Sequence, residues 1–181
     1  MMKILQTGFN GLLIIEPRVF RDERGYFFES WNQEAFAEVG LNFPFVQDNQ
    51  SGSVKDVIRG LHFQVPPFEQ GKLVRVVTGS VLDVAVDLRK AEPTFGMHFR
   101  MLLDAASGNM LYIPPGFAHG FRTLEDGTVF AYKCTKPYHA NSDRVIRWND
   151  PSLAIDWGIA DPLVSEKDRQ GPLLSAFDNP F

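Results

Sequence analysis

The run from Lys72 to Leu88 constrains the fold most, because it has the pattern of two β-strands joined by a short turn at Thr78-Gly79. If these two residues form the loop, Val77 pairs with Ser80 and the side chains alternate between two faces. One predicted face carries Lys72, Val74, Val76, Val81, Asp83, Ala85 and Asp87, and the other carries Leu82, Val84, Val86 and Leu88. We therefore expect a β-hairpin with one dry face and a second face that presents Lys72 and Asp83 to a cavity or to solvent.

Short strand-like segments separated by turn residues recur along the chain. Beyond the hairpin, we expect strands at residues 12–20 (interrupted at Pro17), 26–30, 43–49, 98–103, 110–113, 117–123 and 128–134. Asn32 is expected to cap a short helix over residues 33–39, with Gly40 ending it. This pattern favours an antiparallel sandwich or a jelly-roll barrel, around which the segment after Tyr138 wraps as loops and short helices.

The composition is that of one globular domain, which we expect to span residues 1–181. The chain is 44% hydrophobic and 22% charged, with no linker, repeat or low-complexity tract. A net charge of -4 argues against broad nucleic-acid binding, and no apolar run approaches the length of a membrane span. Cys134 is the only cysteine, so an intrachain disulfide is excluded. With no signal-peptide pattern at the N-terminus, a cytoplasmic enzyme or binding protein is expected.

Three segments place basic or titratable groups beside aromatic and apolar residues. They are Arg59-Gly60-Leu61-His62-Phe63-Gln64, the apolar run that contains Lys72, and Pro114-Pro115-Gly116-Phe117-Ala118-His119-Gly120-Phe121. Polar and charged groups in an apolar setting are costly unless they are paired, and such groups cluster at functional sites. We interpret the three segments as walls of one pocket suited to proton transfer.

His62 and Lys72 are the main chemical candidates. A histidine titrates near neutral pH, which suits a general base, whereas an isolated histidine is more often a core residue bonded to a backbone carbonyl. The cations Arg59 and Lys72 nearby favour the functional interpretation. Lys72 either extends to the surface or stabilises an enolate oxygen from inside the pocket, held in place by Asp83 opposite.

The remaining candidates each have a structural alternative. Tyr132 and Tyr138 can act as a proton donor or a stacking surface, or they can simply line the rim of a barrel. His119 is either an anion donor or a structural histidine. Asp168 either orients a histidine or completes a helix cap with Ser165. Arginine forks match phosphate oxygens, so a set of cations is a candidate diphosphate grip: Arg24, Arg59 and Lys167.

Four stretches together resemble the dTDP-4-dehydrorhamnose 3,5-epimerase family. They are residues 59–64, the run Gln70–Arg89, residues 114–121 and Tyr132-Lys133-Cys134-Thr135, and the resemblance extends from about Arg24 to about Asp168. It implies a cupin-like jelly-roll fold, a homodimer to which the N-terminal strands contribute, and no cofactor or metal. The implied reaction inverts C3 and C5 of dTDP-4-dehydro-6-deoxy-D-glucose.

The resemblance also implies residue roles. His62 matches the general base and Asp168 its carboxylate partner, Tyr132 matches the general acid, and Lys72 matches the residue beside the C4 carbonyl oxygen, with Asp83 near it. Tyr138 matches the residue that stacks on thymine. The positions that match substrate contacts are Arg24, Glu29, Gln47, Asp48, Asn49, Arg59, Lys72, His119 and Asp143, the last standing where the family often has Glu. Trp157-Gly158 departs from the family's usual Trp-Pro.

Three alternatives remain open at this level. A metal-dependent cupin would need a cluster of His and carboxylate ligands, whereas Gln64 stands where a second ligand would be expected and Lys72 would repel a cation. A non-catalytic nucleotide-sugar binding module would need no acid and base on opposing faces. A mono-epimerase that inverts only C3 or only C5 would use the same catalytic residues.

Overall fold

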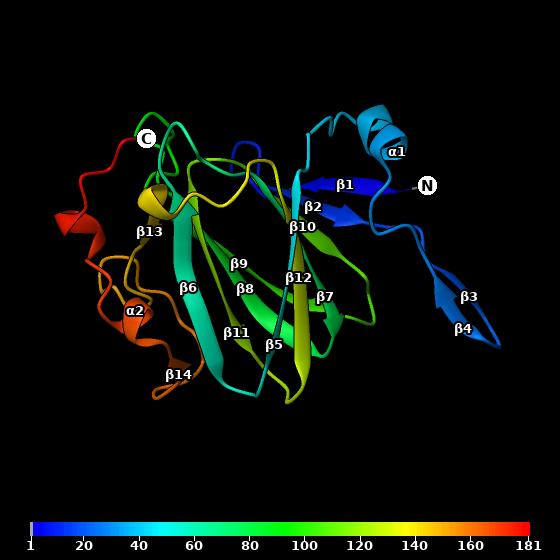
Figure 1. The fold of residues 1–181 in the computed structure, drawn as a ribbon. Coiled ribbons are helices and arrows are strands. Elements are labelled where there is room, and N and C mark those ends of the chain that lie inside the picture. The colour runs from blue at the N-terminus through cyan, green and yellow to red at the C-terminus, as the bar shows by residue number, and fades with distance from the viewer. Residues whose placement is uncertain (1) are drawn as a thin grey trace.

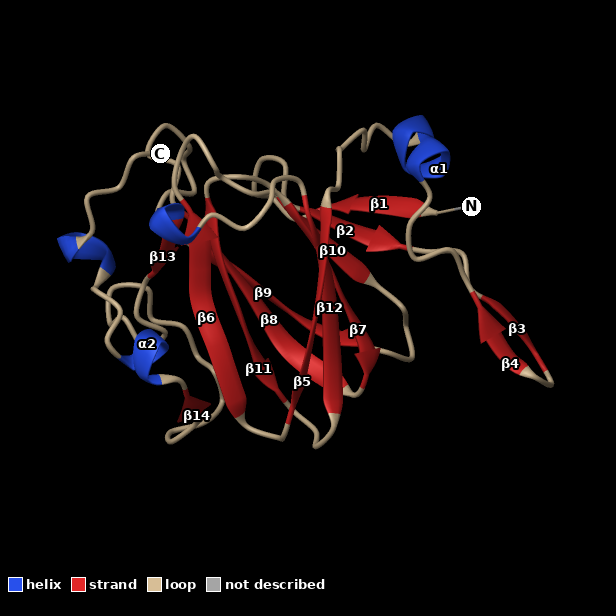
Figure 2. Cartoon of the chain, in the orientation of Figure 1, coloured by secondary structure: helices blue, strands red, loops and turns tan. Residues whose placement is uncertain are grey.

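The structure is a computed structural model that describes residues 2–181. It consists mainly of β-strands (Figure 1; Figure 2). The first sheet has the strand order β1 (Lys3–Gln6), β2 (Leu13–Glu16), β10 (Met110–Ile113), β7 (Lys72–Thr78), β12 (Thr128–Cys134) and β5 (Gln47–Ser53). The second has the order β13 (Asp143–Val145), β6 (Val57–Gln64), β11 (Phe117–Thr123), β8 (Ser80–Asp87) and β9 (His98–Asp104), with β14 (Leu163–Val164) also beside β6. The predicted cupin-like jelly roll is confirmed.

The predicted hairpin between residues 72 and 88 is wrong, although both of its strands exist. β7 pairs with β10 and β12, whereas β8 pairs with β11 and β9, so the two strands lie in different sheets. Gly79, with a φ of +79°, makes the bend between the sheets, and a Cβ there would stand 2.5 Å from the Thr128 hydroxyl. The inward faces of the two strands therefore meet across the barrel instead of side by side.

Apolar side chains from both sheets fill the space between them. This interior cluster contains Leu12, Val74, Val76, Val81, Ala85, Leu103, Leu111, Ile113, Phe117, Phe121 and Phe130. Val74, Val76, Val81 and Ala85 thus share the interior, as the alternation predicted. Burial at roughly 25 cal/mol per Å² of apolar surface makes this cluster a main source of stability.

Two further clusters cover the outer faces of the sheets. On the second sheet, Leu82, Val84, Val86 and Leu88 pack against the chain that follows β12, including Ile146, Leu153 and Trp157. This C-terminal part contains β13, β14 and the helix α2 (Glu166–Arg169), all beside β6 in Figure 1. On the first sheet, Leu73 and Met110 pack against helix α1 (Gln33–Glu38) and the coil that follows it. Asn32 caps α1 through its side-chain oxygen, as predicted.

The N-terminal region differs most from the predicted strands. In place of the strands predicted over residues 12–20 and 26–30, the chain forms β2 and a separate two-stranded arm, made of β3 (Phe20–Asp22) and β4 (Gly25–Phe27). The β3–β4 arm projects from the body in Figure 1. Residues 43–46 are coil, because Phe43 and Phe45 pack on Trp31 and Tyr112 instead of joining β5. The strands predicted within residues 98–134 are confirmed, and no helix among residues 2–181 is long and apolar enough to span a membrane.

Candidate active site

The two sheets enclose a cavity of about 360 Å³, called here the barrel cavity. Strands β5, β7 and β12 of the first sheet and β6 and β11 of the second contribute to its lining, together with residues from the C-terminal part. Ten of the predicted site residues line it: Gln47, Asn49, Arg59, His62, Lys72, His119, Tyr132, Tyr138, Asp143 and Lys167. The fold thus gathers groups that lie far apart in the sequence into one polar chamber with aromatic walls.

His62 forms a hydrogen-bonded pair with Asp168. The His62 Nε2–Asp168 Oδ1 distance is 2.6 Å, and the Gly60 amide donates to the other carboxylate oxygen at 3.2 Å. The backbone of Asp168 is held as well, since its amide donates to the Oγ of Ser165, the N-cap of α2. Ser165 is the helix cap, as predicted, but the Asp168 carboxylate does not complete a capping box, because both of its oxygens bond to β6.

The electrostatics of this pair favour a charged carboxylate. Burial raises the pKa of the Asp168 carboxyl, but hydrogen bonds from His62 and from the Gly60 amide outweigh burial and hold the pKa below its ordinary value. A fixed carboxylate orients the imidazole and stabilises it when it carries a proton. Nδ1 of His62 has no hydrogen-bond partner within residues 2–181, so it remains available to a molecule in the barrel cavity.

Lys72 places an ammonium between the two sheets. Its Nζ donates to the His62 carbonyl oxygen at 3.3 Å and lies 5.9 Å from the centre of the Tyr132 ring. Burial lowers the pKa of Lys72, and the nearby acidic groups Cys134, Asp143 and Asp83 only partly oppose this. Lys72 is half-buried and has no salt bridge to a carboxylate among residues 2–181. Such an ammonium is suited to an oxyanion that forms during a reaction.

Tyr132 enters the barrel cavity from the opposite sheet to His62. It lies on β12, between Asn49 of β5 and Val74 of β7, whereas His62 lies on β6. Burial raises the pKa of the Tyr132 phenol, with Cys134 and Asp143 acting in the same direction. The phenol therefore keeps its proton, so the barrel cavity has a proton acceptor on one wall and a proton donor on the other.

Asp83 does not hold Lys72, contrary to the sequence-based expectation. It bonds to His119 instead, with 2.9 Å between His119 Nε2 and Asp83 Oδ2. The reason is the sheet assignment: β8 and β11 are neighbours, so Asp83 is a diagonal neighbour of His119, whereas Lys72 lies in the other sheet. Each cavity histidine thus has one carboxylate, and among residues 2–181 no three His, Cys, Asp or Glu side chains gather closely enough to hold a metal ion.

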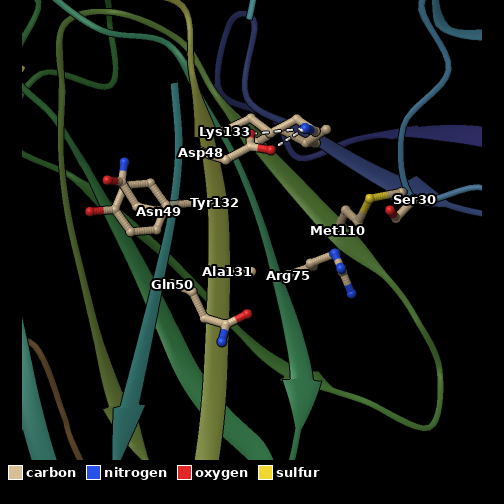
Figure 3. Close-up of a pocket in the computed structure, with 10 residues that line it drawn as sticks. Ser30, Asp48, Asn49, Gln50, Arg75, Met110, Ala131, Tyr132 and Lys133 are labelled. Carbon is tan, nitrogen blue, oxygen red and sulfur yellow. Dashed lines mark hydrogen bonds and ion pairs between the residues drawn. The ribbon is translucent and has the colours of Figure 1, made fainter. Parts of the chain in front are cut away.

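Three predicted substrate contacts lie outside the barrel cavity of this chain. Arg24 lies on the β3–β4 arm, paired with Asp22, and Glu29 accepts a hydrogen bond from Asn32 beside α1. Asp48 lies between two inward residues of β5 and so points to the outer face, where it binds Lys133 at 2.9 Å. Figure 3 shows Asp48, Lys133, Arg75 and Met110 around this second hollow, of about 270 Å³.

Gln64 and Cys134 also line the cavity, although the sequence patterns predicted no site role for either. Gln64 follows His62 by two positions on β6, and Cys134 follows Tyr132 by two positions on β12, so strand alternation alone would have found both. The Gln64 amide donates to the Phe68 and Pro137 carbonyls and accepts from the His139 amide. Gln64 therefore holds the loops at the cavity mouth.

Comparisons with known proteins identify the family of the chain. The family model described as dTDP-4-dehydrorhamnose 3,5-epimerase matches residues 6–176. A Shigella flexneri protein of that name is 50% identical over 171 residues, covering 94% of each chain. Two solved structures superpose with a TM-score of 0.93. One, from Bacillus anthracis with TDP and PPi bound, is 45% identical and covers 96% of this chain and 99% of its own. The other, from Legionella pneumophila in complex with dTDP-4-keto-L-rhamnose, is 46% identical and covers 98% of this chain and 95% of its own. The chain belongs to the dTDP-4-dehydrorhamnose 3,5-epimerase family.

Proposed function

We propose that this protein is an isomerase that converts dTDP-4-dehydro-6-deoxy-D-glucose to dTDP-4-dehydro-L-rhamnose by inverting C3 and C5. The observation that carries the proposal is the placement of His62 and Tyr132 on opposite sheets of one cavity, with the Lys72 ammonium between them. Inversion of a carbon centre needs a base on one face of the ring and an acid on the other. The names and ligands of the similar proteins support the same substrate class.

The C4 ketone explains how one set of residues serves two carbons. It acidifies the hydrogens on both C3 and C5, and removal of either gives an enolate with its charge on the same oxygen. His62 accepts the proton, Lys72 stabilises the enolate oxygen, and Tyr132 returns a proton to the opposite face. A positioned acid or base contributes roughly 10²- to 10⁴-fold. The reaction changes no oxidation state overall, so the proposed mechanism uses no cofactor.

We assign binding of the nucleotide end of the substrate to two cations and one tyrosine that line the barrel cavity. Arg59 and Lys167 line the cavity and are proposed to bind the diphosphate, with His119 deeper inside. Tyr138 is 59% exposed and its hydroxyl donates to Asp143, which also pairs with Lys167. This exposed ring, held at its edge, suits stacking on thymine.

The β3–β4 arm supports a homodimer. Its apolar side chains are exposed, with Phe20, Tyr26 and Phe27 at 48%, 57% and 65%. Exposed aromatic residues in such a group mark interaction surfaces. We assign the arm to a second copy of the chain, where Arg24 and Glu29 would approach the partner's cavity. Sedimentation should give a particle of twice the chain mass, and a monomer at micromolar concentration would contradict this.

A cytoplasmic location is also proposed. The sole cysteine, Cys134, is buried and unpaired among the described residues, which fits a reducing compartment.

The direct test is NMR of the product formed in D₂O from the 4-dehydro-6-deoxyglucose nucleotide. We expect deuterium at both C3 and C5 in D₂O and, in a parallel reaction in H₂O, a product with the proton couplings of the L-rhamno configuration. Deuterium with inversion at only one carbon would instead establish a mono-epimerase. No deuterium at either carbon, with the nucleotide sugar still bound, would leave only a binding module.

A further inference from the structure

Gly60 of β6 and Gly120 of β11 touch each other directly. A Cβ on Gly60 would stand 2.6 Å from the Gly120 α-carbon, and a Cβ on Gly120 would stand 2.8 Å from the Arg59 carbonyl oxygen. Both clashes are with backbone, which cannot turn away as a flexible side chain would. Gly60 also has a φ of +147°, which side-chain-bearing residues rarely adopt. No residue other than glycine fits at either position without moving one strand off the other.

This contact coincides with a break in the strand register. His119 lies opposite His62, but Phe121 lies opposite Arg59. Between these two pairs, β11 contributes only Gly120, whereas β6 contributes Gly60 and Leu61. Two residues facing one is the arrangement of a β-bulge, a device that re-aims the side chains of the bulged strand.

The bulge changes which side chains of β6 enter the barrel cavity. In an unbroken strand, residues three apart point to opposite faces. Arg59 and His62 are three apart, yet both line the cavity. On the other face, Ile58 and Leu61 are also three apart, yet both belong to the outer cluster under the C-terminal part. Without the extra residue, strand alternation would turn either Arg59 or His62 away from the barrel cavity.

The bulge also directs a backbone donor to the carboxylate behind His62. The Gly60 amide donates to Asp168 Oδ2 at 3.2 Å, while the following residue, Leu61, exchanges two backbone hydrogen bonds of 3.0 Å with Ile146. Asp168 is 2% exposed, so this amide is one of the few donors available to it. The position of the Asp168 carboxylate is therefore tied to the backbone at the bulge.

We propose that Gly60 and Gly120 are positioning residues for proton abstraction. Their contact permits the bulge that brings Arg59 and His62 into one cavity and sets Asp168 against the His62 ring. Neither glycine is among the residues that line the barrel cavity, so both act through the side chains of β6. The proposal rests on the proposed function for its kinetic consequence, but the geometry it describes can be tested without any turnover.

The kinetic test compares Gly120→Ala with Gly52→Ala. Gly120 and Gly52 both lie in strands without a positive φ, but a Cβ on Gly52 would have no atom within 4 Å. For Gly120→Ala we expect kcat to fall about 100-fold, the effect of a displacement of about 1 Å in a catalytic group. The Kd for dTDP should rise by a smaller factor, because Arg59 moves with β6 while Lys167 and Tyr138 keep their places. Gly52→Ala should keep both constants within about threefold, the small effect usual for a surface site. Equal kcat values in the two variants would overturn the proposal.

Amide hydrogen exchange separates positioning from mere stability. In Gly120→Ala, the Gly60 amide should lose its protection at a temperature where the protein is folded, because its Asp168 acceptor is displaced. A purely structural role predicts instead a lower melting temperature with an unchanged Gly60 amide and a kcat reduced only by the unfolded fraction. Should Gly120→Ala not fold, Asp168→Ala should expose the Gly60 amide alone within β6. Unchanged protection there would refute the link, and failure of the wild-type protein to epimerise would refute only the proposed function.

Discussion

The barrel contains two histidine–carboxylate pairs that differ in their access to the cavity. The side chain of His62 is 33% exposed and its partner Asp168 is 3% exposed, whereas His119 and Asp83 are 7% and 0% exposed. The first pair joins a strand to the cap of α2, and the second joins two neighbouring strands, with its histidine beside the ring of Phe130. The two histidines are themselves opposite each other on β6 and β11.

The difference suits the two pairs to different roles. An open imidazole with a free Nδ1 can exchange protons with a bound sugar, and its buried carboxylate holds it in place. The closed pair satisfies a carboxylate that would otherwise be stranded in an apolar interior, and it adds polarity to the cavity floor. One Asp83 oxygen has no partner within the described residues, which underlines how little solvent reaches that pair.

The largest expected effect is catalytic and belongs to the open pair. We expect His62→Ala to lower kcat by about 10³- to 10⁴-fold, because it removes the proposed general base, and to leave dTDP binding largely intact. The factor by which His119→Ala lowers kcat should be at least ten times smaller than the factor for His62→Ala, because His119 is assigned only a substrate contact. Steady-state kinetics on the two purified variants checks this. A larger loss of kcat in His119→Ala would reverse the assignment of the two histidines.

The second expected effect is on stability and belongs to the closed pair. His119→Ala leaves the Asp83 carboxylate buried without its partner, which should cost about 3–5 kcal/mol of unfolding free energy. His62→Ala should cost about 1 kcal/mol, because Asp168 keeps the Gly60 amide and water can enter from the cavity. Urea unfolding of both variants measures the difference. Equal losses would mean that access to the cavity does not distinguish the pairs.

A third effect concerns the alkaline side of the rate profile. Because burial lowers the pKa of Lys72, its ammonium should be lost below the ordinary lysine value of about 10.4, and kcat should fall with it. The pKa of Tyr132 is shifted upward, so ionisation of the phenol does not cause this fall of kcat. In Lys72→Arg, this fall of kcat should occur at higher pH. A fall at the same pH as in the wild type would mean that another group causes it.

The smallest effect is the acid dependence of stability. The folded pKa of Asp168 lies below its unfolded value of about 3.9, so the ionised carboxylate stabilises the fold above that pH. The contribution is lost as the pH falls through the folded pKa. The difference in unfolding free energy between wild type and Asp168→Asn should therefore shrink below pH 3.9 or so. A difference that stays constant in acid would show that Asp168 is not held by charged hydrogen bonds.

The sequence predicted the residues of the cavity better than it predicted the pairing of the strands. Alternation along β7 and β8 placed Val74, Val76, Val81 and Ala85 on one interior face correctly. It could not show that Gly79 crosses between sheets, because a two-residue turn and a sheet-crossing bend have the same local pattern. That missing information led to the wrong partner for Asp83.

Positions inside motifs were harder to assign than the motifs themselves. All three residues of Gln47-Asp48-Asn49 match substrate contacts in the sequence, although strand alternation directs the Asp48 side chain to the outer face. The bulge at Gly60 was not visible either, because the spacing of Arg59 and His62 implies opposite faces until the facing Gly120 is known. Long-range pairing, rather than residue type, decides both cases.

The measurement that tests the two-wall mechanism most directly is solvent deuterium exchange in Tyr132→Phe. With the phenol removed and His62 intact, we expect NMR to show deuterium entering C3 or C5 while almost no inverted sugar forms. That result would separate proton removal on one sheet from proton return on the other. Loss of exchange together with inversion would contradict the account, because proton removal would then also depend on the Tyr132 wall.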